Sequence, residues 1–235
     1  MFIPLGFEHS FERRGFVTLG IAALCVGVWI VRLANGAGDD FGGCALDPEN
    51  FRVHQLLTSS FLHAGAFHLA FNLLFLWTFG RYVEDRLGEW RFLVVYLGCA
   101  VVGDLAYLAS RASTPAVGAS GAIAGLMGWV LVAAPWTEVR FAFFMLPYAS
   151  RMYELAVGWL LAGWILLQLA LALFGGAGDV AVAAHLGGFA AGAAAGAWMR
   201  SRLCLGTGWY VDPRPPEGGP AAVARLRAAR ARGTS

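Results

Sequence analysis

The chain has 235 residues, of which 58% are hydrophobic and 14% are charged, and its formal net charge is +2. A soluble domain usually carries about a quarter charged residues, so the composition indicates a protein embedded in a lipid bilayer. The small net charge argues against nucleic acid as a partner. The four cysteines have no paired spacing, which argues against a disulfide framework or a zinc site; they are Cys25, Cys44, Cys99 and Cys204.

Six apolar stretches approach the roughly 20 residues that a helix needs to span a bilayer. They cover residues 16–33, 65–79, 92–110, 119–134, 155–174 and 180–199. Two of them are somewhat short, which is tolerated where a helix lies inside a bundle. The pattern predicts an all-α fold, a polytopic membrane bundle of six transmembrane helices. Arg13 and Arg14 resemble a twin-arginine export signal, but we favour a retained first helix with flanking positive charge.

Arginine residues predict the orientation of the bundle. One side collects those before the first stretch, between the second and third, between the fourth and fifth, and after the sixth: Arg13, Arg14, Arg81, Arg86, Arg91, Arg140, Arg151, Arg200, Arg202, Arg214, Arg225, Arg227, Arg230 and Arg232. The opposite side has Arg52 and Arg111, with Arg32 at the end of the first stretch. We therefore expect both termini in the cytoplasm. The basic residues are all Arg, with no Lys, and the apolar bulk is Ala, Leu, Val and Gly, a bias that favours a bacterium and so a multi-pass protein of the inner membrane.

The chain divides into three parts. Residues 1–15 form a cytoplasmic N-terminus, residues 16–200 the six-span membrane domain, and residues 201–235 a basic tail that contains Pro and Gly. The external loop, residues 34–64, mixes acidic with apolar residues and is expected to form short helices at the membrane interface. The tail fits two readings equally: a basic helix on anionic lipid, or a disordered segment that only enforces topology.

Polar residues within transmembrane segments are costly and are therefore candidates for function. The fourth stretch begins with Gly118-Ala119-Ser120-Gly121. A serine between small residues at a helix start has an accessible hydroxyl and an unpaired backbone N–H, as a nucleophile and an oxyanion donor require. On its own the motif is weak, because Gly and Ser also line helix contacts in membranes.

The sixth stretch contains Ala184-His185-Leu186-Gly187-Gly188. A histidine here is either a catalytic base or a residue that hydrogen-bonds a neighbouring helix. Glycines favour the first reading, because they let two helices approach closely, as a Ser–His hydrogen bond demands. They recur along both stretches, at Gly121, Gly125 and Gly128 and at Gly188, Gly192 and Gly196.

The second stretch carries His68 and Asn72, four residues apart and so on one helical face. Both side chains can donate hydrogen bonds to an oxyanion, although they could also only fix helix packing. The predicted topology places His68, Ser120 and His185 at similar depth, a few residues below the external surface. Such agreement favours a joint catalytic site.

From about Gln55 to Met199 the sequence closely resembles the rhomboid family of intramembrane serine proteases. The motifs are Phe61-Leu62-His63-Ala64, His68-x-x-x-Asn72, Gly80-x-x-x-Glu84-x-x-x-Gly88, Gly118-Ala119-Ser120-Gly121-Ala122 and Ala184-His185-Leu186-Gly187-Gly188. The resemblance implies Ser120 as nucleophile, His185 as base, and His68 and Asn72 as oxyanion donors with the Ser120 N–H. His63 and Glu84 match positions that we interpret as structural. The family often has Trp followed by Arg or Gln where this chain has His54-Gln55.

The resemblance implies a serine endopeptidase that cleaves single-span transmembrane proteins in the lipid bilayer, with no metal and no cofactor. Two rivals are a catalytically inactive relative that acts as a membrane chaperone or trafficking factor, and a small transporter or channel. The intact Ser and His argue against the first, and the absence of paired intramembrane charges argues against the second.

We expect a Ser–His dyad without a third carboxylate. Asp104 and Asp179 are the nearest acids, and an ionised carboxylate buried in a membrane is costly unless it is well partnered. Asp104 is expected to be protonated or paired with a nearby polar group such as Tyr107. Aromatic or apolar packing is expected to hold His185 in place.

Overall fold

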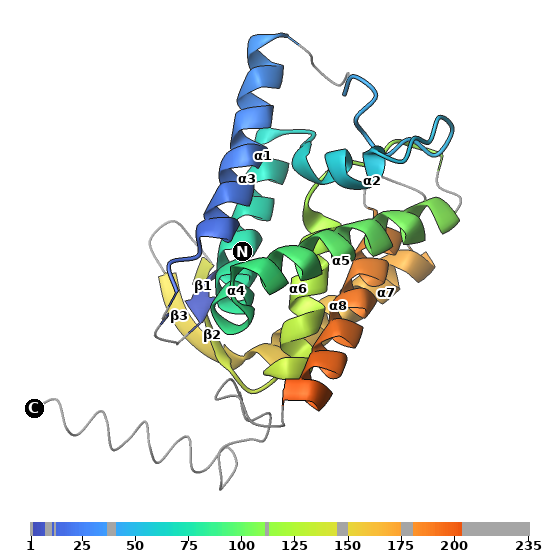
Figure 1. Cartoon of the computed structure of the whole chain (residues 1–235). Helices are drawn as coiled ribbons and strands as arrows, with labels where there is room; N and C mark the ends of the chain where they lie inside the picture. The colour runs from blue at the N-terminus through green and yellow to red at the C-terminus, as the bar shows by residue number, and fades with distance from the viewer. Residues whose placement is uncertain are drawn as a thin grey trace, which may run out of the picture.

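The computed structural model describes residues 2–7, 11, 13–36, 41–110, 113–144, 150–174 and 181–203. The predictions for part of the external loop, for Asp179, for Cys204 and for the tail beyond residue 203 lie outside these residues. Figure 1 shows α1 (Phe16–Ala34) on one side of the molecule, α7 (Val157–Phe174) and α8 (Val182–Leu203) on the other, and α6 (Ser120–Ala133) between them.

Five further helical segments connect these elements. They are α2 (Gln55–Thr58), the 3-10 turn η1 (Ser59–Phe61), α3 (Ala66–Phe75), α4 (Arg81–Leu87) and α5 (Glu89–Ala109). A π-helical turn, η2 (Leu76–Gly80), joins α3 to α4. The second apolar stretch therefore continues as a helix well beyond its predicted end, until Gly88, whose φ of +77° ends it.

Among the described residues, three helices are long and apolar enough to cross a bilayer, namely α1, α5 and α7. The pair Gln55–Phe61 and Ala66–Leu87 is bent by 98° and adds a fourth if it counts as one broken span. Helix α6 is apolar but has only 14 residues, and its interior positions are buried. A short fourth helix inside the bundle agrees with the prediction, whereas the total of six spans stays a prediction.

A three-stranded antiparallel sheet accompanies the helices, so the prediction of an all-α fold is wrong in this part. Its strands β1 (Phe2–Phe7), β2 (Glu138–Phe144) and β3 (Ser150–Ala156) lie in the order β1-β2-β3. Strand β1 occupies the predicted N-terminal segment, and β3 includes Leu155, the first residue of the predicted fifth stretch. Strand β2 begins where Glu138, Val139 and Arg140 alternate between polar and apolar residues, a period of two that favours a strand.

Helix α1 joins the bundle at its N-terminal end. Both oxygens of the Glu84 carboxylate accept hydrogen bonds from the first turn of α1, from the backbone N–H groups of Val17 (3.0 Å) and Thr18 (2.8 Å). The neighbouring carboxylate, Asp85, accepts the N–H of Arg13 at 2.7 Å. Because the first N–H groups of a helix have no intrahelical partner, α4 supplies the cap that Gly15, the residue before α1, cannot provide.

Residues 41–64, the described part of the loop predicted to be external, are folded around Gln55, which is 2% exposed. Its Oε1 accepts the N–H groups of Asp47 (3.2 Å) and Arg52 (3.1 Å), and its Nε2 donates to Gly43 O at 3.1 Å. Backbone N–H groups of Asn50 and Glu49 hold the pKa of the Asp47 carboxyl below its usual range.

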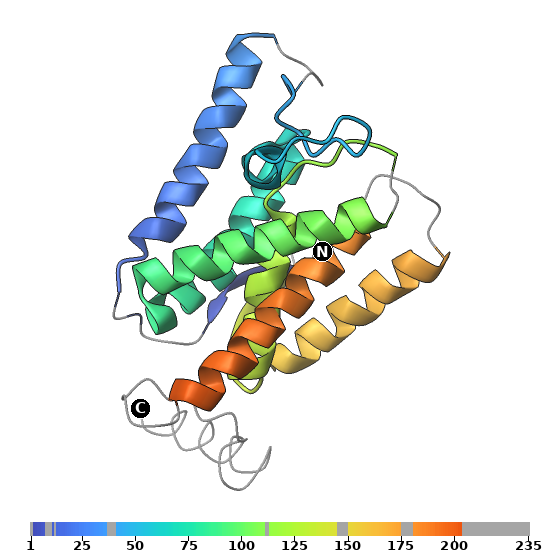
Figure 2. The same cartoon turned by 45° about the vertical axis from the view of Figure 1, so that its right-hand side comes forward.

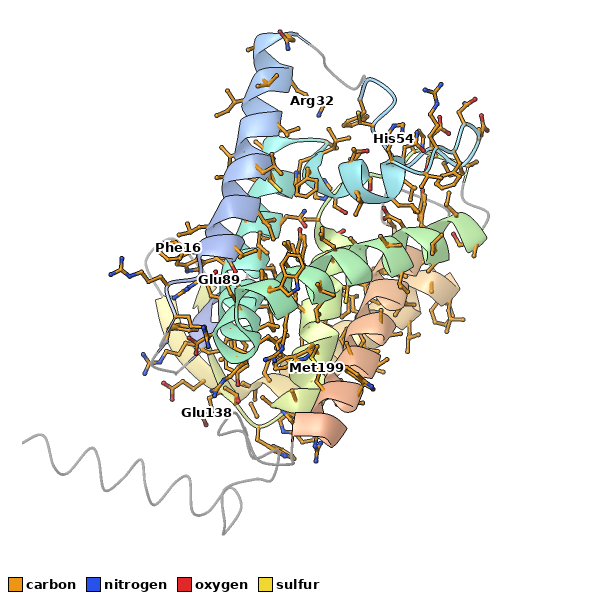
Figure 3. The ribbon with its side chains drawn as sticks, viewed as in Figure 1. Phe16, Arg32, His54, Glu89, Glu138 and Met199 are labelled. Carbon is orange, nitrogen blue, oxygen red and sulfur yellow. The ribbon has the colours of Figure 1, made fainter. Side chains whose placement is uncertain are left out.

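In Figure 3, Arg32 and His54 lie toward one end of the molecule and Glu138 and Met199 toward the other. The loop therefore lies at the opposite end from the beginning of β2.

Glycines bring α6 and α8 into backbone contact, and Figure 2 shows the two helices side by side. A Cβ added at Gly188 would overlap the carbonyl of Gly121, and one added at Gly192 would overlap the carbonyl of Gly125. Each of these sites therefore excludes every side chain larger than hydrogen. The predicted close contact between the fourth and sixth helices is present.

Candidate active site

Ser120 is the first residue of α6. The two residues before it form a turn in which Gly118 has a φ of +128°, a backbone conformation that favours glycine. The serine side chain is half-buried, and its backbone N–H belongs to the first turn, whose donors have no acceptor within the helix. The fold thus presents a hydroxyl and a backbone donor together at the start of the helix.

His185 lies in the first turn of α8, opposite Ser120. Its Nε2 is 2.8 Å from Ser120 Oγ, within hydrogen-bond distance. The contact exists because the glycines of α6 and α8 let the backbones touch. Two residues that are 65 positions apart in the sequence therefore meet at one end of the helix pair.

The other ring nitrogen of His185 has a partner that the sequence analysis missed. Nδ1 lies 3.0 Å from Oε1 of Gln168, a residue of α7 that is 5% exposed. The ring of Trp164, one turn earlier on α7, lies 6.1 Å from the His185 ring, centroid to centroid. Aromatic packing beside His185 is present as expected, but the expectation omitted this hydrogen bond to an amide. A lone Gln in an otherwise apolar helix was the available signal.

His68 borders the same space as Ser120. A Cβ added at Gly118 would lie 2.8 Å from the His68 Nε2 atom and 3.8 Å from Ser120 Oγ. The imidazole of His68 is itself packed edge-on against His63, with ring centroids 5.2 Å apart. His63 is 1% exposed, and its carbonyl accepts a hydrogen bond from Arg32 Nη1 at 3.1 Å. His63 therefore supports the position of His68 from the loop.

Asn72 lies one helical turn beyond His68 on α3 and is 6% exposed. Its Nδ2 donates to the His68 carbonyl at 2.9 Å. The amide has a second N–H, so this bond to the helix occupies only half of its donor capacity. Among the described residues, the hydrogen bond of the Asn72 side chain is to the His68 carbonyl and not to Ser120.

Asp104 meets a residue that is distant in the sequence. Its Oδ2 accepts a hydrogen bond from Ser59 Oγ at 2.7 Å, whereas Tyr107 donates its hydroxyl to Thr114 O at 2.8 Å. The expected pairing of Asp104 with a polar group is present, but the group is the Ser59 hydroxyl and not that of Tyr107. The carbonyl of the same Ser59 accepts the N–H of Gly118 at 2.9 Å. Asp104 and Ser59 thus hold the turn that precedes Ser120.

A second segment of the same loop, at Leu46, binds the chain just before this turn. Leu46 and Ala116 form an isolated antiparallel bridge, with Leu46 N donating to Ala116 O at 3.0 Å and Ala116 N donating to Leu46 O at 2.9 Å. Backbone bonds therefore fix the segment before Ser120 at two points, Ala116 and Gly118.

Parts of the chain are similar to known proteins. The chain is 45% identical over 80 residues to the rhomboid protease GluP of Bacillus subtilis, a match covering 34% of this chain and 16% of that protein. It is 34% identical over 165 residues to the mitochondrial Rhomboid protein 1 of Saccharomyces cerevisiae, covering 67% and 42%. It is 31% identical over 193 residues to the rhomboid protease GlpG of an Enterobacter species, covering 78% and 63%.

Each match spans less than two thirds of the relative's own length. The family profile described as the Rhomboid domain matches residues 50–202, from the external loop to the last turns of α8, which is more than half of the chain. The matched range includes Ser120, His185, His68 and Asn72. The chain therefore belongs to the rhomboid family.

Proposed function

We propose that the protein is an intramembrane serine endopeptidase that cleaves transmembrane segments through a Ser120–His185 dyad. The observation that carries the proposal is the distance of 2.8 Å between His185 Nε2 and Ser120 Oγ. A serine hydroxyl is a weak nucleophile until a base removes its proton, and an imidazole at hydrogen-bond distance can do so. The names of the relatives, which are rhomboid proteases, support the same activity.

The first half of the reaction forms an acyl-enzyme. His185 Nε2 takes the proton of Ser120 as Oγ attacks the carbonyl carbon of the scissile peptide bond. The developing oxyanion accepts hydrogen bonds from the Ser120 N–H, His68 and Asn72, because donors aimed at that charge lower the barrier. His185 then gives its proton to the leaving amine, and the C–N bond breaks.

The second half releases the enzyme. Water gives a proton to His185 and attacks the ester carbonyl, the tetrahedral intermediate collapses, and Ser120 recovers its proton as the acid product leaves. The half-buried positions of Ser120 and His185 support this proposal, because a water-accessible cavity is needed inside a largely apolar protein.

The proposed substrates are single-span membrane proteins, cleaved within the lipid bilayer. We further propose six spans, with both termini in the cytoplasm of a bacterium. The arginine distribution supports this topology. The separation of Arg32 and His54 from Glu138 and Met199 toward opposite ends of the molecule agrees with it (Figure 3).

The alternative of an inactive rhomboid relative, acting as a chaperone or trafficking factor, predicts a broken Ser–His contact. The contact of 2.8 Å instead favours an enzyme. The alternative of a transporter or channel predicts paired charges along a path through the membrane, whereas Asp104 bonds a serine hydroxyl.

Labelling with a serine-directed fluorophosphonate tests the enzymatic proposal. The purified protein in detergent should be labelled at one site, and Ser120→Ala should abolish the label. Ser110→Ala is a matched control, because the Ser110 hydroxyl donates to Tyr107 O and lies outside the proposed site. A parent protein that resists labelling under conditions that label a known serine protease would favour the two alternatives.

A further inference from the structure

Gln168 is the one amide or charged side chain in the sequence of α7. Its side chain is 5% exposed, whereas the exposed positions of the same helix are mostly apolar. A polar group buried in a membrane helix is costly unless it has a hydrogen-bond partner. Its partner here is His185, which suggests that the residue serves the site rather than the helix.

The contact determines which nitrogen of His185 carries the proton. Gln168 Oε1 can only accept a hydrogen bond, so Nδ1, at 3.0 Å, must be the donor. In the neutral ring the other nitrogen, Nε2, then has a lone pair, and Ser120 Oγ at 2.8 Å donates to it. The protonation state imposed by Gln168 is therefore the one in which Nε2 can remove the serine proton.

Two contacts between α7 and α8 fix the orientation of the ring. Gln168 and Trp164 are four residues apart on α7, and His185 and Phe189 are four apart on α8, so each pair lies on one face. Trp164 stacks on Phe189 with ring centroids 5.7 Å apart and lies beside the His185 ring at 6.1 Å. The aromatic contact restrains the ring plane, and the amide fixes the hydrogen on Nδ1.

We propose that Gln168 is a positioning residue for the proteolytic reaction, the neutral counterpart of the aspartate in a soluble serine protease triad. The proposal rests on the proposed function, since it assigns a partner to the same base. An amide can orient the histidine and select its tautomer, but it has no charge with which to stabilise the imidazolium. It also avoids the burial of an ionised carboxylate.

The test compares three variants in liposomes containing a model transmembrane substrate. Gln168→Leu removes the acceptor at similar size, and Gln168→Glu keeps an acceptor oxygen. Leu161→Ala is the control for packing, because Leu161 is fully buried on α7 seven residues before Gln168 and therefore on the same face. For each variant kcat, KM, the rate of fluorophosphonate labelling and the melting temperature are measured.

Gln168→Leu should lower kcat roughly ten- to a hundredfold, because it leaves Nδ1–H buried without a partner and frees the other tautomer. KM should stay within about twofold of the parent. Labelling should slow in parallel, since it requires the same activation of Ser120 but no transmembrane substrate. Gln168→Glu should recover most of the loss, whereas Leu161→Ala should lower the melting temperature with a smaller effect on kcat.

Two results would overturn the positioning role. One is a Gln168→Leu enzyme with the kcat and labelling rate of the parent. The other is a loss of kcat in Leu161→Ala that equals the loss in Gln168→Leu at the same drop in melting temperature, which would assign the effect to packing. In both cases the parent still cleaves and is labelled, so the proposed function stands. A parent that neither cleaves nor is labelled would instead overturn the proposed function.

Discussion

The Glu84 carboxylate binds Thr18 twice, accepting its backbone N–H at 2.8 Å and its hydroxyl at 2.6 Å through the same oxygen. Glu84 is fully buried, and its second oxygen accepts the N–H of Val17. A single acidic side chain therefore ties the end of the second predicted span to the beginning of the first.

Glu84→Ala should lower the free energy of unfolding by about 1–3 kcal/mol, because it leaves buried donors without an acceptor. Glu84→Gln should fall between this variant and the parent, since an amide keeps one acceptor oxygen. Glu89→Ala is the matched control, because Glu89 is an exposed acid in the first turn of α5. Unfolding in denaturing detergent gives the comparison, and equal stability of Glu84→Ala and Glu89→Ala would refute the capping role.

Gly188→Leu should impair both folding and activity, because any Cβ at this position overlaps the carbonyl of Gly121. The two helices would have to separate, and Ser120 and His185 would separate with them. Gly98→Leu is the control, since a Cβ at Gly98, also on a long apolar helix, meets nothing within 4 Å. Melting temperature and cleavage rate should fall together for Gly188→Leu and stay near the parent values for Gly98→Leu. An active, normally melting Gly188→Leu protein would contradict the contact.

Removal of one oxyanion donor typically lowers kcat about a hundred- to a thousandfold. Asn72→Ala should lower kcat by no more than this amount. The loss should be smaller than that of Ser120→Ala, because His68 and the Ser120 N–H remain. Thr78→Val provides the control: Thr78 lies in the helical continuation of α3 and also donates to the carbonyl four residues back, Leu74 O, at 2.9 Å. A kcat for Asn72→Ala equal to that of the parent would remove Asn72 from the oxyanion site.

Asp104→Asn should retain activity within about tenfold, against the roughly ten-thousandfold loss expected for a triad aspartate. An asparagine oxygen still accepts the hydroxyl of Ser59, so the turn at Gly118 keeps its support. Asp104→Leu removes that acceptor and should lower kcat further than Asp104→Asn does. Cleavage rates in detergent and in liposomes check both variants, and a thousandfold loss for a folded Asp104→Asn protein would make Asp104 a member of the catalytic group.

The sequence predicts the helices and the meeting of α6 with α8 because glycine periodicity is a local signal with a single steric meaning. It also indicates that Ser120, His185 and His68 share one depth, since each lies near the end of an apolar stretch. These inferences require only the lengths and faces of helices, which a sequence carries directly.

Pairings between distant segments could not be predicted in this way. Ser59 and Asp104 are 45 residues apart, and nothing in either local sequence selects the other. Gln168 was missed for a different reason: the third residue of a serine protease triad is a carboxylate, whereas here an amide oxygen is the partner of Nδ1. The sheet was missed because its strands have only six or seven residues each, and β3 runs directly into the apolar stretch of α7, where a period of two is difficult to distinguish.

The most direct test of the central claim is cleavage of a model transmembrane substrate by purified Ser120→Ala and His185→Ala proteins in liposomes. We predict that each single variant and the double variant lose cleavage to a similar extent, because the two residues act as one unit. All three should remain inserted in the membrane and should melt near the parent temperature. Robust cleavage by purified Ser120→Ala would contradict the claim that Ser120 is the nucleophile.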